Sequence, residues 1–141
     1  METDGTSRKK LNIEGRVSSG LGRGAQFLGI EWVQRELREK LGLNPYSGTL
    51  NLRVTAADWS DLYGRRENFV KIADPQSDNC PGYLQRVALR ANGLICPSAF
   101  VILPELSMYK DVLEIIAEGN LREMLRLKDG DRILVEEFRE P

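Results

Sequence analysis

Short segments with the alternating pattern of β-strands, separated by glycine, proline and asparagine turns, most constrain the fold of this chain. In the clearest of them, residues 49–54, apolar and polar side chains alternate strictly, with Leu50, Leu52 and Val54 on one face. Further strands are predicted at residues 13–17, 69–72, 84–89, 94–103, 112–117 and 132–138. Helical segments do not alternate regularly with these strands, which disfavours a parallel βαβ sheet. The pattern favours a mainly β (α+β) fold in which the sheet closes into a barrel and helices pack outside it.

The strongest helix signal is the recurrence, at helical spacing, of the apolar side chains Ile30, Val33, Leu37 and Leu41. Gly42 then supplies a C-terminal stop. A second helix is predicted over residues 55–63, where Thr55 and Asp58 form a capping box. Asn120 is the expected N-cap of a further helix, whose apolar side chains are Leu121, Met124 and Leu125.

The composition is that of a soluble globular protein, with 41% apolar and 29% charged residues. The net charge is -1 and the basic residues are dispersed, so we expect no nucleic-acid partner. Residues 1–10 are polar and are expected to be a disordered leader, neither signal peptide nor anchor, ahead of a single domain at residues 11–141. No later apolar run approaches the length of a membrane span, so we expect a cytoplasmic protein without a membrane partner. We also expect it to be a monomer.

Histidine is absent from the chain. Its absence excludes Ser-His and Cys-His nucleophilic machinery and the common zinc sites, so acid–base chemistry falls to carboxylates, lysine, tyrosine or water. The two cysteines, Cys80 and Cys96, lack the spacing of metal ligands and are expected to be reduced thiols.

A glycine-rich segment at residues 20–25 directly follows the first predicted strand. Glycines let consecutive backbone N–H groups converge on phosphate oxygens. The segment has neither the Gly-Lys-Ser/Thr ending of a P-loop nor the βαβ context of a dinucleotide fingerprint. A nucleotide-phosphate loop is one interpretation, and a plain flexible turn is the other.

Polar side chains on the predicted strand 49–54 form a second candidate site. Thr49 and Asn51 place a hydroxyl and an amide oxygen on one face, about 7 Å apart along the strand. Together with phosphate oxygens and water, such neutral oxygens suit Mg²⁺. The alternative is that they are the solvent-facing side of an amphipathic strand.

Glu114 lies within the apolar run 112–117, where a carboxylate is costly unless it has a partner. It is either a substrate-binding or proton-accepting group, or a surface residue on an edge strand. A last candidate is the start of the helix after Asn120, where Arg122 could help to hold a phosphate or a base edge. The alternative there is an ordinary helix-to-strand turn.

In their amino-acid sequences and their order along the chain, residues 15–25, 41–52 and 104–131 resemble the archaeal CTP-dependent riboflavin kinase family. The resemblance implies a cradle-loop, riboflavin-kinase-like barrel that transfers the terminal phosphate of CTP to riboflavin, giving FMN and CDP. By position it implies one Mg²⁺ ion on Thr49 and Asn51, and flavin contacts at Ser107 and Glu114, with Glu114 as the candidate catalytic residue. It implies nucleotide contacts at two segments, consisting of Gly20, Leu21, Gly22, Arg23, Gly24 and Ala25, and of Gly119, Asn120, Leu121 and Arg122.

The chain departs from the family pattern at a few positions. Arg23 stands where the family usually has Glu, and Ser107-Met108-Tyr109 stands in place of a Thr-His cluster. A kinase of the same fold acting on another small alcohol is therefore one alternative. A non-catalytic binding module is another, because swapped-hairpin regulators share the signature at residues 127–131. Their DNA-binding faces are basic, whereas this chain is slightly acidic.

Overall fold

The computed structural model describes residues 10–19, 27–74, 76, 81–105 and 109–139. The strands are β1 (Asn12–Ser18), β2 (Leu50–Arg53), β3 (Val70–Ile72), β4 (Gly82–Ala91), β5 (Leu94–Pro104), β6 (Val112–Ile116) and β7 (Arg132–Glu137). The helices are α2 (Glu31–Leu41), α3 (Ala56–Gly64) and α4 (Leu121–Met124), together with a 3₁₀ turn, η2 (Arg66–Asn68). Residues 1–9, which hold most of the predicted leader, lie outside the described residues, as does Cys80.

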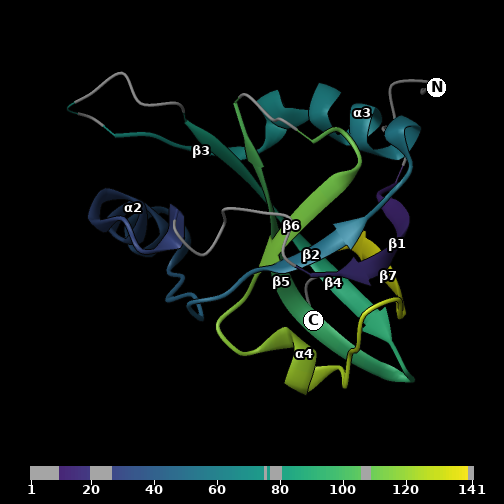
Figure 1. The fold of residues 1–141 in the computed structure, drawn as a ribbon. Coiled ribbons are helices and arrows are strands. Elements are labelled where there is room, and N and C mark those ends of the chain that lie inside the picture. The colour runs from purple at the N-terminus through teal and green to yellow at the C-terminus, as the bar shows by residue number, and fades with distance from the viewer. Residues whose placement is uncertain (1–9, 20–26, 75, 77–80, 106–108, 140–141) are drawn as a thin grey trace.

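The strands form a 7-stranded sheet in the order β3-β4-β5-β6-β2-β1-β7, and every pairing is antiparallel. An additional pairing between β4 and β7 closes the sheet, and β3 extends from β4 outside the closed part. Figure 1 shows the closed strands curving around a common interior while β3 projects away from it. The predicted β-barrel is therefore confirmed.

One side-chain row from each closed strand fills the barrel interior. Leu52 of β2, Ile115 of β6, Val101 of β5 and Val135 of β7 are fully buried in this cluster. The β4–β5 hairpin turns at Asn92 and Gly93, whose φ values of 53° and 74° are those that a two-residue hairpin turn requires. The alternating apolar residues of the two strands and the turn residues between them therefore specify this hairpin from local sequence.

Helix α2 packs outside the barrel, as predicted, and creates a second apolar cluster. Trp32, Val33 and Leu37 contact the outward-facing side chains of β3 to β6, among them Ile72, Leu84, Phe100, Ile102 and Ile116. The helix ends at Gly42, which adopts the left-handed conformation at φ 63° and donates its N–H to Arg38 and Leu37 carbonyls. Ile30, expected on the apolar face, instead precedes the helix and is 42% exposed.

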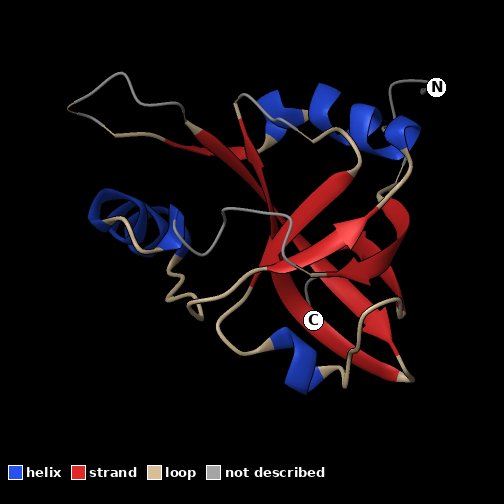
Figure 2. Cartoon of the chain, viewed as in Figure 1, coloured by secondary structure: helices blue, strands red, loops and turns tan. Residues whose placement is uncertain are grey.

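The shorter helices begin at the predicted caps. Asp58 N–H donates to Thr55 Oγ1 at 3.0 Å, and Glu123 N–H donates to Asn120 Oδ1 at 3.3 Å. In α4, Leu121 is buried as expected, whereas Met124 is 46% exposed because the helix ends after a single turn. Figure 2 shows α3 and α4 at opposite ends of the barrel. None of the helices within the described ranges is long and apolar enough to cross a membrane.

Candidate functional site

A polar row crosses the outer face of the barrel over three neighbouring strands. Asn51 of β2 pairs with Glu114 of β6 on one side and with Ser18 of β1 on the other. Paired residues of antiparallel strands direct their side chains to the same face, so these three side chains share one surface. On the far side of Glu114 the row continues with the apolar Ile102. The polar groups therefore occupy the β1, β2 and β6 end of the row, beside the apolar cluster under α2.

Asn51 is the buried polar residue of this row. Only 9% of its surface is exposed, and its Oδ1 atom has no hydrogen-bond partner within the described part of the chain. Asn51 is buried, so the alternative that strand 49–54 presents its polar face to solvent is wrong for this residue. A buried amide oxygen without a partner is costly in a folded protein. It is therefore a candidate ligand for a group that binds here.

Thr49 and Glu114 complete this polar group. Thr49 Oγ1 lies 3.5 Å from Glu114 Oε1, a long hydrogen bond between half-buried side chains. β6 lies between β5 and β2, so the alternative that Glu114 is on an edge strand is wrong. The structure thus brings together Thr49, Asn51 and Glu114, as the predicted metal and flavin contacts require.

These oxygens fit a hard cation. A hydroxyl, an unpartnered amide oxygen and a carboxylate are the ligand types that Mg²⁺ takes, usually with phosphate oxygens and water. Within the described ranges, no group of at least 3 His, Cys, Asp or Glu side chains forms a metal-binding cluster. A metal held at Asn51 would therefore depend on a bound nucleotide for much of its coordination.

Arg122 joins α4 to the end of β1. Its Nη2 donates to Asp129 Oδ1 at 2.8 Å, to Ser19 Oγ at 3.0 Å and to the Ser18 carbonyl at 3.3 Å. Ser19 Oγ also donates to Asp129 Oδ1 at 2.6 Å. The hydrogen bonds from Ser19 and then Arg122 hold the pKa of Asp129 below its ordinary value. The helix-to-strand turn therefore carries a guanidinium beside the residue that leads into the glycine-rich segment.

Some predicted site residues cannot be placed. The glycine-rich segment 20–25 and Ser107 lie outside the described residues. Gly119, Asn120, Leu121 and Arg122 are described, and Arg122 contacts Ser18 and Ser19 immediately before that segment. Leu121 is buried in the barrel core, so its side chain is structural.

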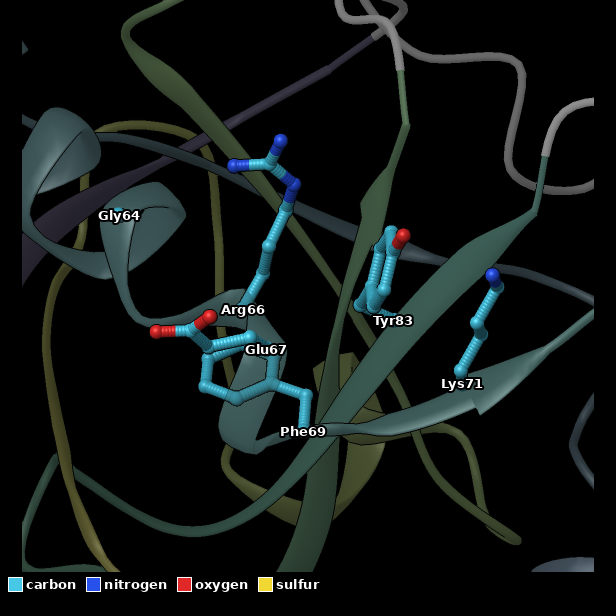
Figure 3. A pocket seen from close by; sticks show the side chains of 6 residues that line it. All are labelled: Gly64, Arg66, Glu67, Phe69, Lys71 and Tyr83. Carbon is cyan, nitrogen blue, oxygen red and sulfur yellow. The ribbon is translucent and has the colours of Figure 1, made fainter.

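A separate pocket of about 410 Å³ lies beyond the end of α3. Figure 3 shows Phe69, Lys71 and Tyr83 along the wall formed by β3 and β4, with Arg66 and Glu67 of η2 nearby. The Tyr83 hydroxyl donates to Glu105 Oε1 at 2.9 Å. Tyr83 neighbours Leu84, which belongs to the row of Ile102 and Glu114, so Tyr83 faces the opposite side of the sheet. None of the predicted site residues that the structure describes lines this pocket.

Comparison with known proteins identifies the family of the chain. The sequence profile of the CTP-dependent riboflavin kinase family, also described as domain of unknown function DUF120, matches residues 17–136. The chain belongs to this family. The match begins at the end of β1 and runs into β7, so it includes β2 to β6 in full.

Individual members of the riboflavin kinase family agree with this assignment. The chain is 35% identical over 134 residues to a riboflavin kinase of Thermoplasma acidophilum, covering 93% of this chain and 59% of that protein. It is 37% identical over 133 residues to a riboflavin kinase of Pyrobaculum islandicum, and the alignment covers 92% of this chain and 62% of that protein. Both relatives are therefore longer, and the chain spans less than two thirds of either. The chain is 30% identical over 126 residues to a riboflavin kinase of Methanosphaera stadtmanae, and the alignment covers 89% of this chain and 96% of that protein.

The sequence interpretation missed two residues of this riboflavin kinase family member that the structure places beside the site. Asp129 was interpreted only as part of a turn, but it accepts from both Arg122 and Ser19. Tyr46 was given no role of its own, but its hydroxyl accepts from Asn120 Nδ2 at 3.2 Å. The hint for Tyr46 was its position inside segment 41–52, which carries the family resemblance, and Asp129 had none beyond its acidity.

Proposed function

We propose that the chain is a kinase that transfers the terminal phosphate of CTP to the 5'-hydroxyl of riboflavin, giving FMN and CDP. Family membership supports the reaction class, and the Methanosphaera protein, 96% of which this chain covers, is itself named a riboflavin kinase. The observation that carries the proposal is the buried, unpartnered Asn51 Oδ1 beside Thr49 and Glu114. Phosphoryl transfer needs mainly positioning and charge neutralisation, which such a site can supply.

The proposed role of Thr49 and Asn51 is to hold one Mg²⁺ ion. When bound, the ion would neutralise charge on the nucleotide phosphates. The residues themselves would fix where the phosphates lie relative to the sheet. Asn51 is suited to this because strand pairing on both sides holds its backbone in place.

Arg122 and the glycine-rich segment are proposed to bind the phosphates of CTP. Arg122 brings a cation to within 3.0 Å of Ser19 Oγ, at the start of that segment. Backbone N–H groups of a glycine-rich segment are suitable donors to phosphate oxygens. Asp129 accepts from Nη2 of Arg122 and so orients the guanidinium.

Glu114 is proposed to bind the ribityl hydroxyls of riboflavin. A half-buried carboxylate accepts hydrogen bonds from hydroxyl groups, and its register with Asn51 places the acceptor beside the metal-binding oxygens. The same carboxylate could take the proton of the attacking hydroxyl, because it is the titratable group of the polar row.

Incubation of the full chain with riboflavin, Mg²⁺ and each of the four ribonucleoside triphosphates tests the proposal, with FMN measured by chromatography. We expect FMN only when Mg²⁺ is present, and fastest formation with CTP. A clear preference for ATP would overturn the donor assignment. Absence of FMN with every donor, from folded protein, would overturn the kinase assignment.

A further inference from the structure

Tyr46 is an exposed aromatic side chain that is nevertheless held in place. It is 43% exposed, yet its N–H donates to the Ala117 carbonyl at 2.8 Å and its hydroxyl accepts from Asn120 at 3.2 Å. The ring also lies over Gly48, since a Cβ atom at Gly48 would sit 3.3 Å from Tyr46 Cε2. Exposed tyrosines without such contacts are free to change rotamer, so this ring is an ordered surface.

The surroundings of Tyr46 connect the two halves of the proposed nucleotide site. The residue lies shortly before Thr49, which leads into β2 and Asn51. Its partner Asn120 caps the turn that carries Arg122, and Arg122 contacts Ser19. Tyr46 therefore lies between the proposed metal ligands and the segment 119–122.

A second exposed apolar side chain lies next to this segment. Met124 is 46% exposed, and a Cβ atom at Gly119 would lie only 2.8 Å from its Sδ. Tyr46 contacts Asn120 and Met124 lies against Gly119, so both add exposed apolar surface beside the segment. Such surface can contact the face of a flat ring.

We propose that Tyr46 is the stacking surface for the nucleobase of the phosphate donor. Aromatic side chains that are pre-ordered and exposed bind bases through their π faces at low entropic cost. The nucleobase is favoured over the flavin ring because the Tyr46 hydroxyl is bonded to Asn120, the cap of the turn that carries Arg122, the proposed phosphate-binding cation. This inference rests on the proposed function, since it assigns a role within the nucleotide site.

Equilibrium binding of CDP to the full chain, measured by calorimetry without riboflavin, tests the role. We expect Tyr46→Leu to weaken CDP binding by about tenfold or more, the scale of losing one base–aromatic stack. Tyr46→Phe keeps the ring and loses only the bond to Asn120, so its affinity should stay within about twofold of wild type. If the hydroxyl only braced the loop, Tyr46→Phe and Tyr46→Leu would weaken binding equally, which would overturn the proposal. Lys71→Ala, on the opposite face of the sheet, is the control and should leave CDP binding unchanged.

Wild-type protein supplies a second measurement that does not depend on a variant's stability. Addition of CDP should shift the ring-proton NMR signals of Tyr46, assigned by their loss in Tyr46→Phe, through the ring current of cytosine. An unshifted Tyr46 signal at saturating CDP would overturn the proposal.

The outcomes separate this inference from the kinase assignment. Wild-type protein that forms FMN, but whose CDP affinity is unaffected by Tyr46→Leu, would overturn the stacking role alone. CDP binding that depends on the Tyr46 ring, in protein that makes no FMN, would support the stacking role and overturn the kinase assignment. Wild-type protein that binds no CDP would overturn the stacking role and the assignment of CTP as the donor, while FMN formation with another donor would leave the kinase assignment standing. A loss of riboflavin affinity alone in Tyr46→Leu would overturn the stacking role, because the ring would then serve the flavin.

Discussion

Asn51 on β2 and Glu114 on β6 are directly paired across adjacent antiparallel strands, and the amide oxygen of Asn51 is buried with no hydrogen-bond partner among the described residues. A buried acceptor left unsatisfied costs free energy in the ligand-free fold. A cation bound to this oxygen would remove that cost. The pairing therefore links the energetics of the sheet to ligand binding.

Asn51→Leu should separate function from stability. The substitution keeps the approximate volume and removes a buried polar group without a partner, so the free energy of unfolding should rise by about 1 kcal/mol. FMN formation should be lost, because an oxygen ligand is missing. Urea unfolding and the chromatographic assay measure the two effects. Near-normal turnover in this variant would contradict the metal assignment.

Glu114→Gln tests whether the carboxylate binds substrate or accepts the proton. Gln keeps one acceptor oxygen, so we expect KM for riboflavin to rise severalfold while kcat changes by less than about tenfold. Loss of a general base would lower kcat by about 10²-fold or more. Steady-state kinetics at saturating CTP distinguish the two. Values unchanged in both parameters would remove Glu114 from the site.

Asp129→Asn should weaken CDP binding while leaving the barrel intact. The charge that orients Arg122 is lost, but the side-chain shape is kept. Because the pKa of Asp129 is lowered in the folded state, its contribution to stability is fully present above the ordinary aspartate pKa. That contribution is lost as the pH falls through the lowered pKa. Urea midpoints of wild type and Asp129→Asn should therefore differ at neutral pH and converge in acid. A difference that persists below both pKa values would contradict the ion-pair explanation.

Cys96 should be unreactive in the native protein. It is a buried thiol, burial raises its pKa, and its Sγ donates to the Ser98 carbonyl at 3.5 Å. Thiolate is the reactive form, so labelling should follow unfolding. The measurement is thiol modification of a Cys80→Ser variant with and without urea. Rapid labelling without urea would show that the β4–β5 end of the barrel opens.

Local sequence signals predicted those parts of the fold that depend on neighbouring residues. The hairpin at Asn92 and Gly93 and the caps at Thr55 and Asn120 all formed as expected, because their hydrogen bonds span only a few residues. Alternation also identified the polar side chains of β2. It could not show that Asn51 is buried or that it lies between Ser18 and Glu114, because the paired strands β1 and β6 come from distant parts of the chain.

Errors in the sequence interpretation arose where tertiary packing overrides periodicity. Ile30 and Met124 fit helical spacing, but each lies at the end of a helix, where no neighbouring element covers the side chain. The sequence left open whether Glu114 lies on an edge strand, because the residues of a strand do not show which other strands pair with it. The contact of Asp129 with Ser19 likewise exists only because β7 returns to pair with β1.

The double pairing of β7 has a consequence for how the chain folds during synthesis. β7 is the most C-terminal described strand, and it alone joins β1 to β4, including the pair Asn12 and Glu136. Until residues 132–137 leave the ribosome, β1 and β4 each expose an edge able to pair with another chain. Pairing between strands that lie this far apart in the sequence is also slow. Nascent chains stalled before Arg132 should therefore be the species that most need a chaperone.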